Sequence, residues 1–424
     1  MKTSLTYLTC LTCLLFIKPP QALSAPSVLT YKYGEQAFDV RPSGYPRWKT
    51  VERTYSFRGV PVVLPPERTT PGKIPQGVEV HEEIIWNREA IRETLESVIA
   101  AKINHDRGTV RISRTPEGNI AFDGAGFPGR KVESALAAEL TLLALEKDIG
   151  IIWLPVVETP PIVLIEDETL KTQGISELVT MGESDFTGSP ANRKHNIGIG
   201  LSKFNGHLIA QGEEFSFNAV LGAVNSREGY RKELTILGER TIPDFGGGLC
   251  QVSTTAYRGV WKAGFPILKR RNHSFAVIYY YPPGTDATIY SPIDMSFQND
   301  SPGSLLIQTL TEGNKAYFFY YGTPRTNRTV ELIGPFTWDV TKPPEDRTMY
   351  TTEIPPGETR IVSKAVPGMR AMWYRSLTDS TGTETFEPFF SFYEARPNIE
   401  EIGVSPDDPR LVKEIAPDRS GEER

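Results

Sequence analysis

Cysteine is scarce in this sequence, and so is histidine. The 424 residues include three cysteines, Cys10, Cys13 and Cys250, and five histidines, which leaves few candidates for metal ligands or disulfides. The formal net charge of −6 provides no global basic field of the kind that nucleic-acid binding needs. A mean hydropathy of −0.30 excludes a polytopic membrane protein. The length and the 39% hydrophobic content favour roughly two or three domains with packed cores.

The first 25 residues are typical of an export signal. A short positive start at Met1-Lys2 precedes the apolar run Leu5–Ile17, which is too short for a membrane span, and the small residues of Ala22-Leu23-Ser24 follow. We therefore predict a signal peptide over 1–25, export to the periplasm or to the cell surface and cell wall, and no transmembrane span after cleavage. An uncleaved anchor is the alternative, because Lys18 directly follows the apolar run.

Removal of the signal leaves Cys250 as the single cysteine of the mature chain. A lone cysteine cannot form an internal disulfide, so the stability must come from packed cores. An odd cysteine in a secreted protein is also a candidate reactive thiol.

The hydrophobic periodicity predicts a multi-domain α+β protein. Residues 26–80 are an irregular or strand-forming lead-in, and 81–180 are predicted to form a compact α+β scaffold domain of helix, hairpin, helix and strand. Its first helix follows the N-cap Asn87 and ends near Asn104, its hairpin strands are 109–112 and 119–122, and its second helix has apolar positions Leu136, Leu140, Leu143 and Ala144.

A denser α+β domain with antiparallel strands is predicted over 185–323. It is expected to contain a helix at Ile197–Leu208, strands Val277–Tyr281 and Ala287–Tyr290 around a Pro-Pro-Gly turn, and paired strands Leu305–Leu310 and Ala316–Tyr321. A small β-rich module over 324–400 and a disordered tail over 401–424 complete the chain.

The most informative stretch surrounds Cys250. The glycines Gly246–Gly248 interrupt any regular element, and Leu249, Val252, Ala256 and Val260 then form one stripe of a helix that Gly264 and Pro266 end. Cys250 is therefore predicted to lie in the first turn of a helix. The helix dipole there favours a thiolate, and the free N–H groups could stabilise an oxyanion.

A nucleophilic thiolate needs a base, and His273, just past the predicted helix, can return beside the helix start. Asp286, Asp294 and backbone carbonyls are all candidates for orienting His273. The alternative is a buried cysteine that acts as a small hydrophobe, with an interfacial His273. The other histidines are expected to be solvated (His81, His105), to interact with a helix C-terminus (His207) or to make a structural hydrogen bond (His195).

Other chemistries lack their motifs. Cys250 and the histidines have no short metal-ligand spacing, so no metal and no cofactor is predicted. The glycines lack the Lys-Ser/Thr of a phosphate-binding loop, and no Gly-x-Ser-x-Gly elbow occurs.

Six motifs in order resemble the VanW domain family. They are Asn192–Ile197, Gly212–Asn218, Glu228–Tyr230, Gly246–Thr255, Asn272–Ser274 and Gly284–Thr288. The segment 81–180 is similar, more loosely, to the peptidoglycan-binding domain that commonly precedes VanW domains.

The resemblance implies work on the cell envelope, with peptidoglycan stem peptides as partners and no nucleic acid. Some VanW members act as L,D-transpeptidases, which implies Cys250 as the nucleophile and His273 as the base here. The stem would be positioned by Asn218, Tyr230, Gly247, Gly248, Gln251, Ser253, Arg271 and Ser274. The alternative is a non-catalytic peptidoglycan-binding or glycopeptide-resistance accessory protein.

Overall fold

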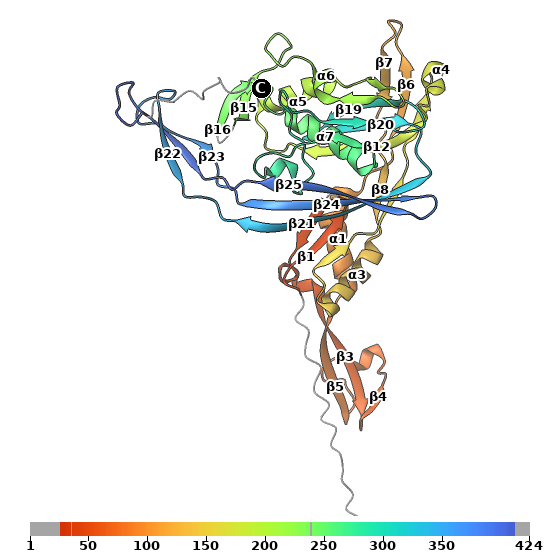
Figure 1. Ribbon diagram of the computed structural model, residues 1–424. Coiled ribbons are helices and arrows are strands. Elements are labelled where there is room, and N and C mark those ends of the chain that lie inside the picture. Colours follow the sequence, from red (N-terminus) through yellow and green to blue (C-terminus); the bar gives the residue numbers. More distant parts are fainter. Residues whose placement is uncertain (1–25, 35, 238–239, 412–424) are drawn as a thin grey trace, which may run out of the picture. The chain divides into compact units, whose positions relative to one another are not determined.

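A computed structural model describes residues 26–34, 36–237 and 240–411. The protein is α+β with several antiparallel sheets and more than one compact unit (Figure 1), as predicted. Unit 1 comprises Met1–Asn104 and Lys131–Val157, and unit 2 comprises His105–Arg130 and Glu158–Arg424. The predicted signal peptide, 1–25, lies outside the described residues. Within the described part of the chain, no helix combines the length and apolar character that a membrane span requires.

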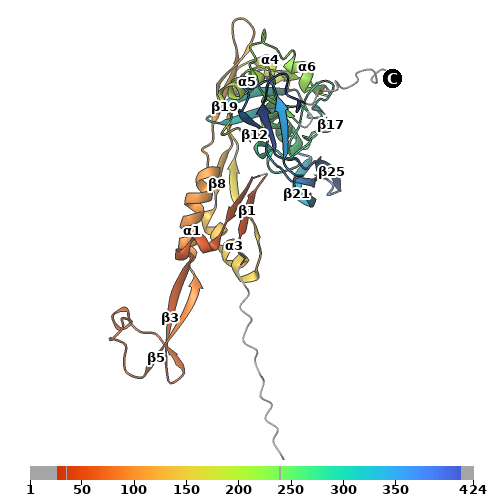
Figure 2. The same cartoon turned by 90° about the vertical axis from the view of Figure 1, so that its left-hand side faces the viewer.

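Unit 1 combines two helical segments with two small sheets (Figure 2). Helix α1 (Arg88–Leu95) begins at Asn87, whose side chain accepts a hydrogen bond of 3.1 Å from the Ala90 N–H. Helical turns continue to Ile103, so the predicted helix is confirmed. The sheets have the orders β2-β1-β9 and β4-β3-β5, with β1 Leu29–Tyr33, β2 Gln36–Val40, β3 Lys49–Phe57, β4 Val60–Val62, β5 Val78–Trp86 and β9 Ile151–Trp153.

The second helix of unit 1 forms where it is expected, and of its four predicted apolar positions Ala144 is buried and Leu140 packs on the core. Helix α3 spans Ser134–Lys147, yet Leu136 and Leu143 are each 47% exposed. The buried face carries smaller residues, including Ala137 and Thr141, and the Thr141 hydroxyl is 2.9 Å from the Tyr31 hydroxyl. Apolar residues lie on nearly every side of this helix, so periodicity alone could not select the buried face.

The predicted scaffold domain over 81–180 is not one unit. Its hairpin exists, as β6 (Thr109–Arg114) and β7 (Ile120–Gly124), but it belongs to unit 2. There β6 pairs in parallel with β11 (Ile162–Ile165). The buried side chains of the hairpin share a hydrophobic cluster with residues of the central sheet of unit 2. The helix–hairpin–helix order therefore does not correspond to a single domain, because the hairpin buries its apolar face within unit 2.

A four-stranded sheet covered by one helix forms the centre of unit 2 (Figure 1). The sheet order is β12-β20-β19-β13, with β12 Glu177–Asp185, β13 Leu208–Ile209, β19 Leu305–Glu312 and β20 Lys315–Gly322. The β19–β20 hairpin is the one predicted. Helix α7 (Leu249–Lys262) packs on β12 and β20. The close approach of α7 to β12 requires glycine at position 182, since a Cβ at Gly182 would lie 1.9 Å from the Thr255 carbonyl oxygen.

Several shorter elements surround this centre. They are α4 Glu168–Thr172, α5 Ala191–Ser202, β14 Glu214–Ser216, α6 Phe217–Leu221, β15 Lys232–Leu237, β16 Arg240–Phe245, β17 Ile267–Lys269 and β18 Ser296–Gln298. Helix α5 begins and ends earlier than the predicted helix Ile197–Leu208, so the predicted bounds were wrong.

The C-terminal strands are attached to the core of unit 2. The segment predicted as a small module over 324–400 forms sheets β21-β24-β25 and β22-β26-β23. Trp373 of β24 belongs to the main hydrophobic cluster, and the buried Arg375 donates hydrogen bonds of 2.8 and 3.0 Å to the carbonyls of Trp261 and Phe265, at the end of α7. Strand bounds are β21 Arg328–Thr341, β22 Arg347–Thr351, β23 Thr359–Ser363, β24 Gly368–Asp379, β25 Glu384–Tyr393 and β26 Ile399–Gly403.

The predicted tail 401–424 therefore starts too early, because its first three residues belong to β26. Residues 412–424 of that tail lie outside the described residues.

Candidate active site

Three glycines bring the chain from β16 into α7. Gly246 and Gly248 have φ of +81° and +112°, which side-chain-bearing residues rarely adopt. A Cβ at Gly247 would lie 2.9 Å from the Glu233 side chain. Gly248 is the N-cap of α7, so the partly exposed Cys250 occupies the first helical turn. The predicted helix start is confirmed.

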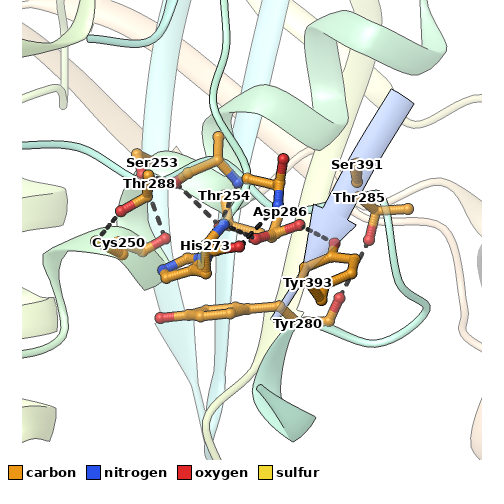
Figure 3. A network of polar contacts seen from close by, with 12 residues as sticks. Cys250, Ser253, Thr254, His273, Tyr280, Thr285, Asp286, Thr288, Ser391 and Tyr393 are labelled. Atoms are coloured by element: carbon orange, nitrogen blue, oxygen red, sulfur yellow. Dashed lines mark hydrogen bonds and ion pairs between the residues drawn. The ribbon is translucent and has the colours of Figure 1, made fainter. Parts of the chain in front are cut away.

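Cys250, His273 and Asp286 lie next to one another (Figure 3), and we call them the Cys250–Asp286 series. The imidazole lies close enough to the thiol to shift its pKa, and the His273 Nδ1–H donates to Asp286 Oδ2 at 2.6 Å. The His273 backbone N–H donates to the same oxygen at 2.7 Å. The orienting group is therefore Asp286. Asp294 binds elsewhere, to the Ser216 hydroxyl at 2.7 Å.

The Asp286 carboxylate is almost fully buried, with 1% of its surface exposed. Its second oxygen accepts hydrogen bonds from the Tyr393 hydroxyl at 2.6 Å and from Arg270 Nη2 at 3.2 Å. Arg270 Nε also donates to the Asp286 carbonyl at 2.7 Å. These donors compensate the buried negative charge and fix the direction in which it meets His273.

The His273 ring is also held from its face. Tyr280 stacks against it with ring centroids 4.4 Å apart and an angle of 17° between the planes (Figure 3). On the other side of the thiol, Cys250 Sγ lies 3.4 Å from the Thr288 hydroxyl and 3.8 Å from the Ile289 carbonyl oxygen. The thiol and imidazole are thus confined by neighbouring side chains, which limits the orientations that they can adopt.

The electrostatics of the three groups favour a thiolate–imidazolium pair. Burial raises the pKa of the Cys250 thiol, but the neighbouring His273, the Ile289 carbonyl and the Thr288 hydroxyl outweigh burial and lower the pKa from 9.0 to about 7. Burial lowers the pKa of His273, whereas its hydrogen bond to Asp286 and the neighbouring Cys250 thiol raise it well above 6.5. For Asp286, the contacts with His273 and Arg270 outweigh burial and hold the pKa far below its ordinary value.

The strands predicted at Val277–Tyr281 and Ala287–Tyr290 do not form. Ile278–Tyr280 is a short 3₁₀ helix, and 287–289 are outside any strand. Side chains of α7 satisfy this backbone instead, because Thr254 Oγ1 accepts from the Ala287 N–H at 3.0 Å and Ser253 Oγ donates to the Ala287 carbonyl at 2.5 Å. These bonds place Asp286 on one side of Ala287 and Thr288 on the other.

Several residues predicted to position a substrate have structural contacts. Gln251 is fully buried, accepting from Arg193 at 3.0 Å and donating to the Asp185 carbonyl at 3.3 Å. Ser253 fixes the Ala287 backbone, as described above. Gly247 and Gly248 shape the turn into α7. It stays a prediction that these four residues contact a peptide.

The remaining predicted positioning residues are separate from the Cys250–Asp286 series. Tyr230 is 2% exposed and lies in the hydrophobic core. Asn218 donates to the Ile293 carbonyl at 2.8 Å, and its N–H donates to Asp294 at 3.0 Å. Arg271 and Ser274 are exposed neighbours of His273. None of these four contacts Cys250, His273 or Asp286 through a side-chain hydrogen bond within the described parts of the chain.

Sequence reasoning missed Arg193, Tyr280 and Tyr393, and it did not link Arg270 to Asp286. Arg193 and Arg270 lie within or beside motifs that were recognised, so their position beside Asn192 and His273 was an available signal. Tyr393 had no such signal, because it is 107 positions from its partner Asp286.

The other histidines do not converge on Cys250. His195 Nε2 lies 3.0 Å from the Gly229 carbonyl oxygen, the structural hydrogen bond that was expected. Burial lowers the pKa of His207, which packs against Phe215. Over the ranges that the structure describes, no three His, Cys, Asp or Glu side chains gather as a metal-binding set.

Comparison with known proteins places this site in a known domain. A family model described as VanW like protein matches residues 192–321. The chain is 32% identical over 165 residues to the uncharacterized protein YoaR of Bacillus subtilis, covering 39% of this chain and 53% of that protein. It is 29% identical over 118 residues to the vancomycin B-type resistance protein VanW of Enterococcus faecalis, covering 26% of this chain and 42% of that protein.

The chain thus spans about half the length of the curated relatives that it matches. The matched range contains Cys250, His273 and Asp286. Residues 192–321 therefore form a VanW-like domain.

Proposed function

We propose that this protein is an exported, cysteine-dependent acyltransferase of the L,D-transpeptidase type that acts on peptidoglycan stem peptides. The observation that carries the proposal is the Cys250–His273–Asp286 series at the start of a helix. A thiol of lowered pKa, a neighbouring imidazole and a carboxylate that orients the imidazole are the three parts of an activated nucleophile.

In the first half-reaction, the Cys250 thiolate attacks the carbonyl carbon of the third stem residue. The C–N bond to the terminal D-alanine breaks, and the His273 imidazolium gives its proton to the leaving amine. The product is a thioester on Cys250 and free D-alanine. Asp286 remains ionised and stabilises the imidazolium before the proton leaves.

In the second half-reaction, a side-chain amine of a neighbouring stem attacks the thioester. The amine loses a proton to His273, the C–S bond breaks, and the thiolate is restored. The new amide is a 3-3 cross-link between stems. Attack by water in place of the amine would give hydrolysis by the same route.

The N-terminus of α7 can stabilise the oxyanion of both tetrahedral intermediates. The Leu249 and Gln251 N–H groups already donate to the Gly246 and Gly248 carbonyls, at 3.0 and 2.9 Å. Among the described residues, the Cys250 N–H has no such backbone acceptor. We therefore assign the oxyanion to the Cys250 N–H, supported by the helix dipole.

A second candidate function is a non-catalytic envelope protein, either peptidoglycan-binding or accessory to glycopeptide resistance. The Enterococcus faecalis relative is a vancomycin B-type resistance protein, which favours work at the cell envelope. Export by residues 1–25 and wall binding by residues 81–180 are part of both proposals. A pure binding groove has no need of a buried carboxylate that raises the pKa of a histidine beside a thiol, so we prefer the catalytic function.

The test is incubation of the purified mature chain with tetrapeptide muropeptides, followed by mass spectrometry. We expect release of D-alanine, a thioester adduct on Cys250 and 3-3 dimers. Cys250→Ala should abolish all three products. Absence of every product with the wild-type chain rejects the acyltransferase, and turnover by the alanine variant rejects Cys250 as the nucleophile.

A further inference from the structure

A guanidinium group beside the thiol has no role in the series described above. Arg193 lies in the first turn of α5. Its Nε donates to the Ser189 hydroxyl at 3.1 Å, and its Nη2 donates to Gln251 at 3.0 Å and to the Tyr280 hydroxyl at 3.4 Å. The group also lies over the Tyr279 ring, 4.9 Å from its centroid.

All of these partners are neutral. Arg270, by comparison, is neutralised by Asp286. No carboxylate forms an ion pair with Arg193 among the residues that the structure describes, and Nη1 has no hydrogen-bond partner among them. The negative group that acts on Arg193 in the free protein is the Cys250 thiolate, whose charge helps to raise the pKa of the arginine. Once Cys250 is acylated that charge is gone, so a partly buried guanidinium with neutral partners favours a second negative group beside it.

The position of Arg193 relates it to both catalytic groups. A Cβ at Gly248 would lie 3.1 Å from Arg193 Cγ and 3.2 Å from its carbonyl oxygen, so the arginine packs directly on the turn before Cys250. Gln251, its amide partner, follows Cys250 in α7. Tyr280, its phenol partner, is the ring stacked on His273. The guanidinium is therefore fixed next to the place where an acyl donor must sit.

We infer that Arg193 binds the free C-terminal carboxylate of the acyl donor, on the residue that leaves. The inference rests on the proposed function and names its donor class: a stem peptide with one residue beyond the attacked carbonyl. Consecutive Cα atoms are about 3.8 Å apart, so the carboxylate of that residue lies one residue length from the carbonyl that Cys250 attacks. A guanidinium can pair with this carboxylate through two parallel hydrogen bonds.

A carboxylate site at Arg193 makes the enzyme selective for the length and the C-terminal group of the donor peptide. A donor with a further residue moves the carboxylate away from Arg193 and puts a neutral amide in its place. The same holds for a donor whose C-terminus is a carboxamide. Both donors leave the cation unpaired, so both should bind and react less well than the free tetrapeptide.

Binding can be measured without chemistry in the Cys250→Ala protein. The probes are a synthetic stem tetrapeptide as the free acid and the same peptide as the C-terminal carboxamide, titrated by calorimetry. We expect the acid to bind about 10- to 100-fold more tightly, the range of a charge-assisted hydrogen bond. Arg193→Gln in this background should bring the two affinities together, and Arg193→Lys should retain part of the preference.

Lys194→Gln is the matched control. It removes a positive charge from the adjacent residue of α5, whose ammonium contacts Asn314 at 2.9 Å, and it should keep the preference intact. Equal affinities in the protein that retains Arg193, binding of neither peptide, or an unchanged preference after Arg193→Gln each overturn the inference. Thermal denaturation of Arg193→Gln checks that the variant is folded.

Acylation of the wild-type chain separates this inference from the proposed function. If both peptides acylate Cys250 at the same rate, the acyltransferase stands and the carboxylate site is rejected. If neither acylates while the alanine variant still prefers the acid, the carboxylate site stands and the acyltransferase is rejected.

Discussion

Tyr393 donates a hydrogen bond of 2.6 Å to Asp286, a residue 107 positions earlier in the chain. Tyr393 is the last residue of β25, so the C-terminal sheet contributes directly to the carboxylate that orients His273. The sheet is therefore part of the machinery around Cys250.

Removal of the Tyr393 hydroxyl should slow acyl transfer while leaving the fold in place. Tyr393→Phe deletes one donor to Asp286, and loss of a hydrogen bond to a charged group is expected to lower kcat/KM about tenfold or more. The measurement is D-alanine release from tetrapeptide donors. Tyr374→Phe, which removes a partly exposed hydroxyl from β24, is the control and should have wild-type kinetics; equal rates for both variants would contradict the assignment.

Asp286 and Asp294 should differ sharply on conversion to asparagine. Asp286→Asn removes the charge that holds His273 and leaves Arg270 without its carboxylate, so activity should fall by on the order of 10³-fold or more and stability should fall by about 3–5 kcal/mol. Asp294→Asn alters contacts with Ser216, Asn218 and the Met295 N–H, none of which belongs to the Cys250–Asp286 series. It should retain most of the activity. Comparable losses of turnover in the two variants would argue that His273 is oriented by something else.

Alkylation of Cys250 should report its lowered pKa. The rate of reaction with iodoacetamide should rise with pH to a midpoint of about 7, because the thiolate is the reactive form. In His273→Gln the stabilising partner is lost while burial remains, so the midpoint should move up to or beyond the ordinary value of 9.0. An unchanged midpoint would mean that His273 does not stabilise the thiolate.

Turnover should have a bell-shaped dependence on pH. The active form has a thiolate and an imidazolium. It becomes populated as pH rises through the Cys250 pKa of about 7 and is lost as pH rises further through the raised pKa of His273. The kcat/KM profile of the wild-type chain measures both limits. A rate that falls as pH increases from 6 to 7 would contradict the ion pair.

Gly248 should tolerate no side chain. In Gly248→Ala the backbone must keep φ at +112°, and the new Cβ meets Arg193 and Ile197 at 3.1 Å. We expect a loss of about 1–3 kcal/mol in the free energy of unfolding, measured with urea. Gly188→Ala has the same kind of strain, with φ at +83° and nothing within 4 Å of the Cβ. It should cost less, and a larger loss at Gly188 than at Gly248 would show that the contacts carry no penalty.

The sequence alone determined the local features around the thiol. Three glycines followed by a stripe of apolar residues at helical spacing predict α7 and put Cys250 in its first turn, because backbone conformation and periodicity are properties of neighbouring residues. The β19–β20 hairpin and the α1 N-cap at Asn87 were predictable for the same reason. The position of His273 after α7 also indicated a base, although not what orients it.

The tertiary structure decided everything that depends on packing between distant segments. It selected Asp286 over Asp294, brought Tyr393 to that carboxylate and placed Arg193 beside Gly248. It also moved the β6–β7 hairpin into unit 2 and chose the buried face of α3. Sequence spacing does not encode these choices, because each one depends on which buried charge finds a donor and which apolar face finds a partner across the fold.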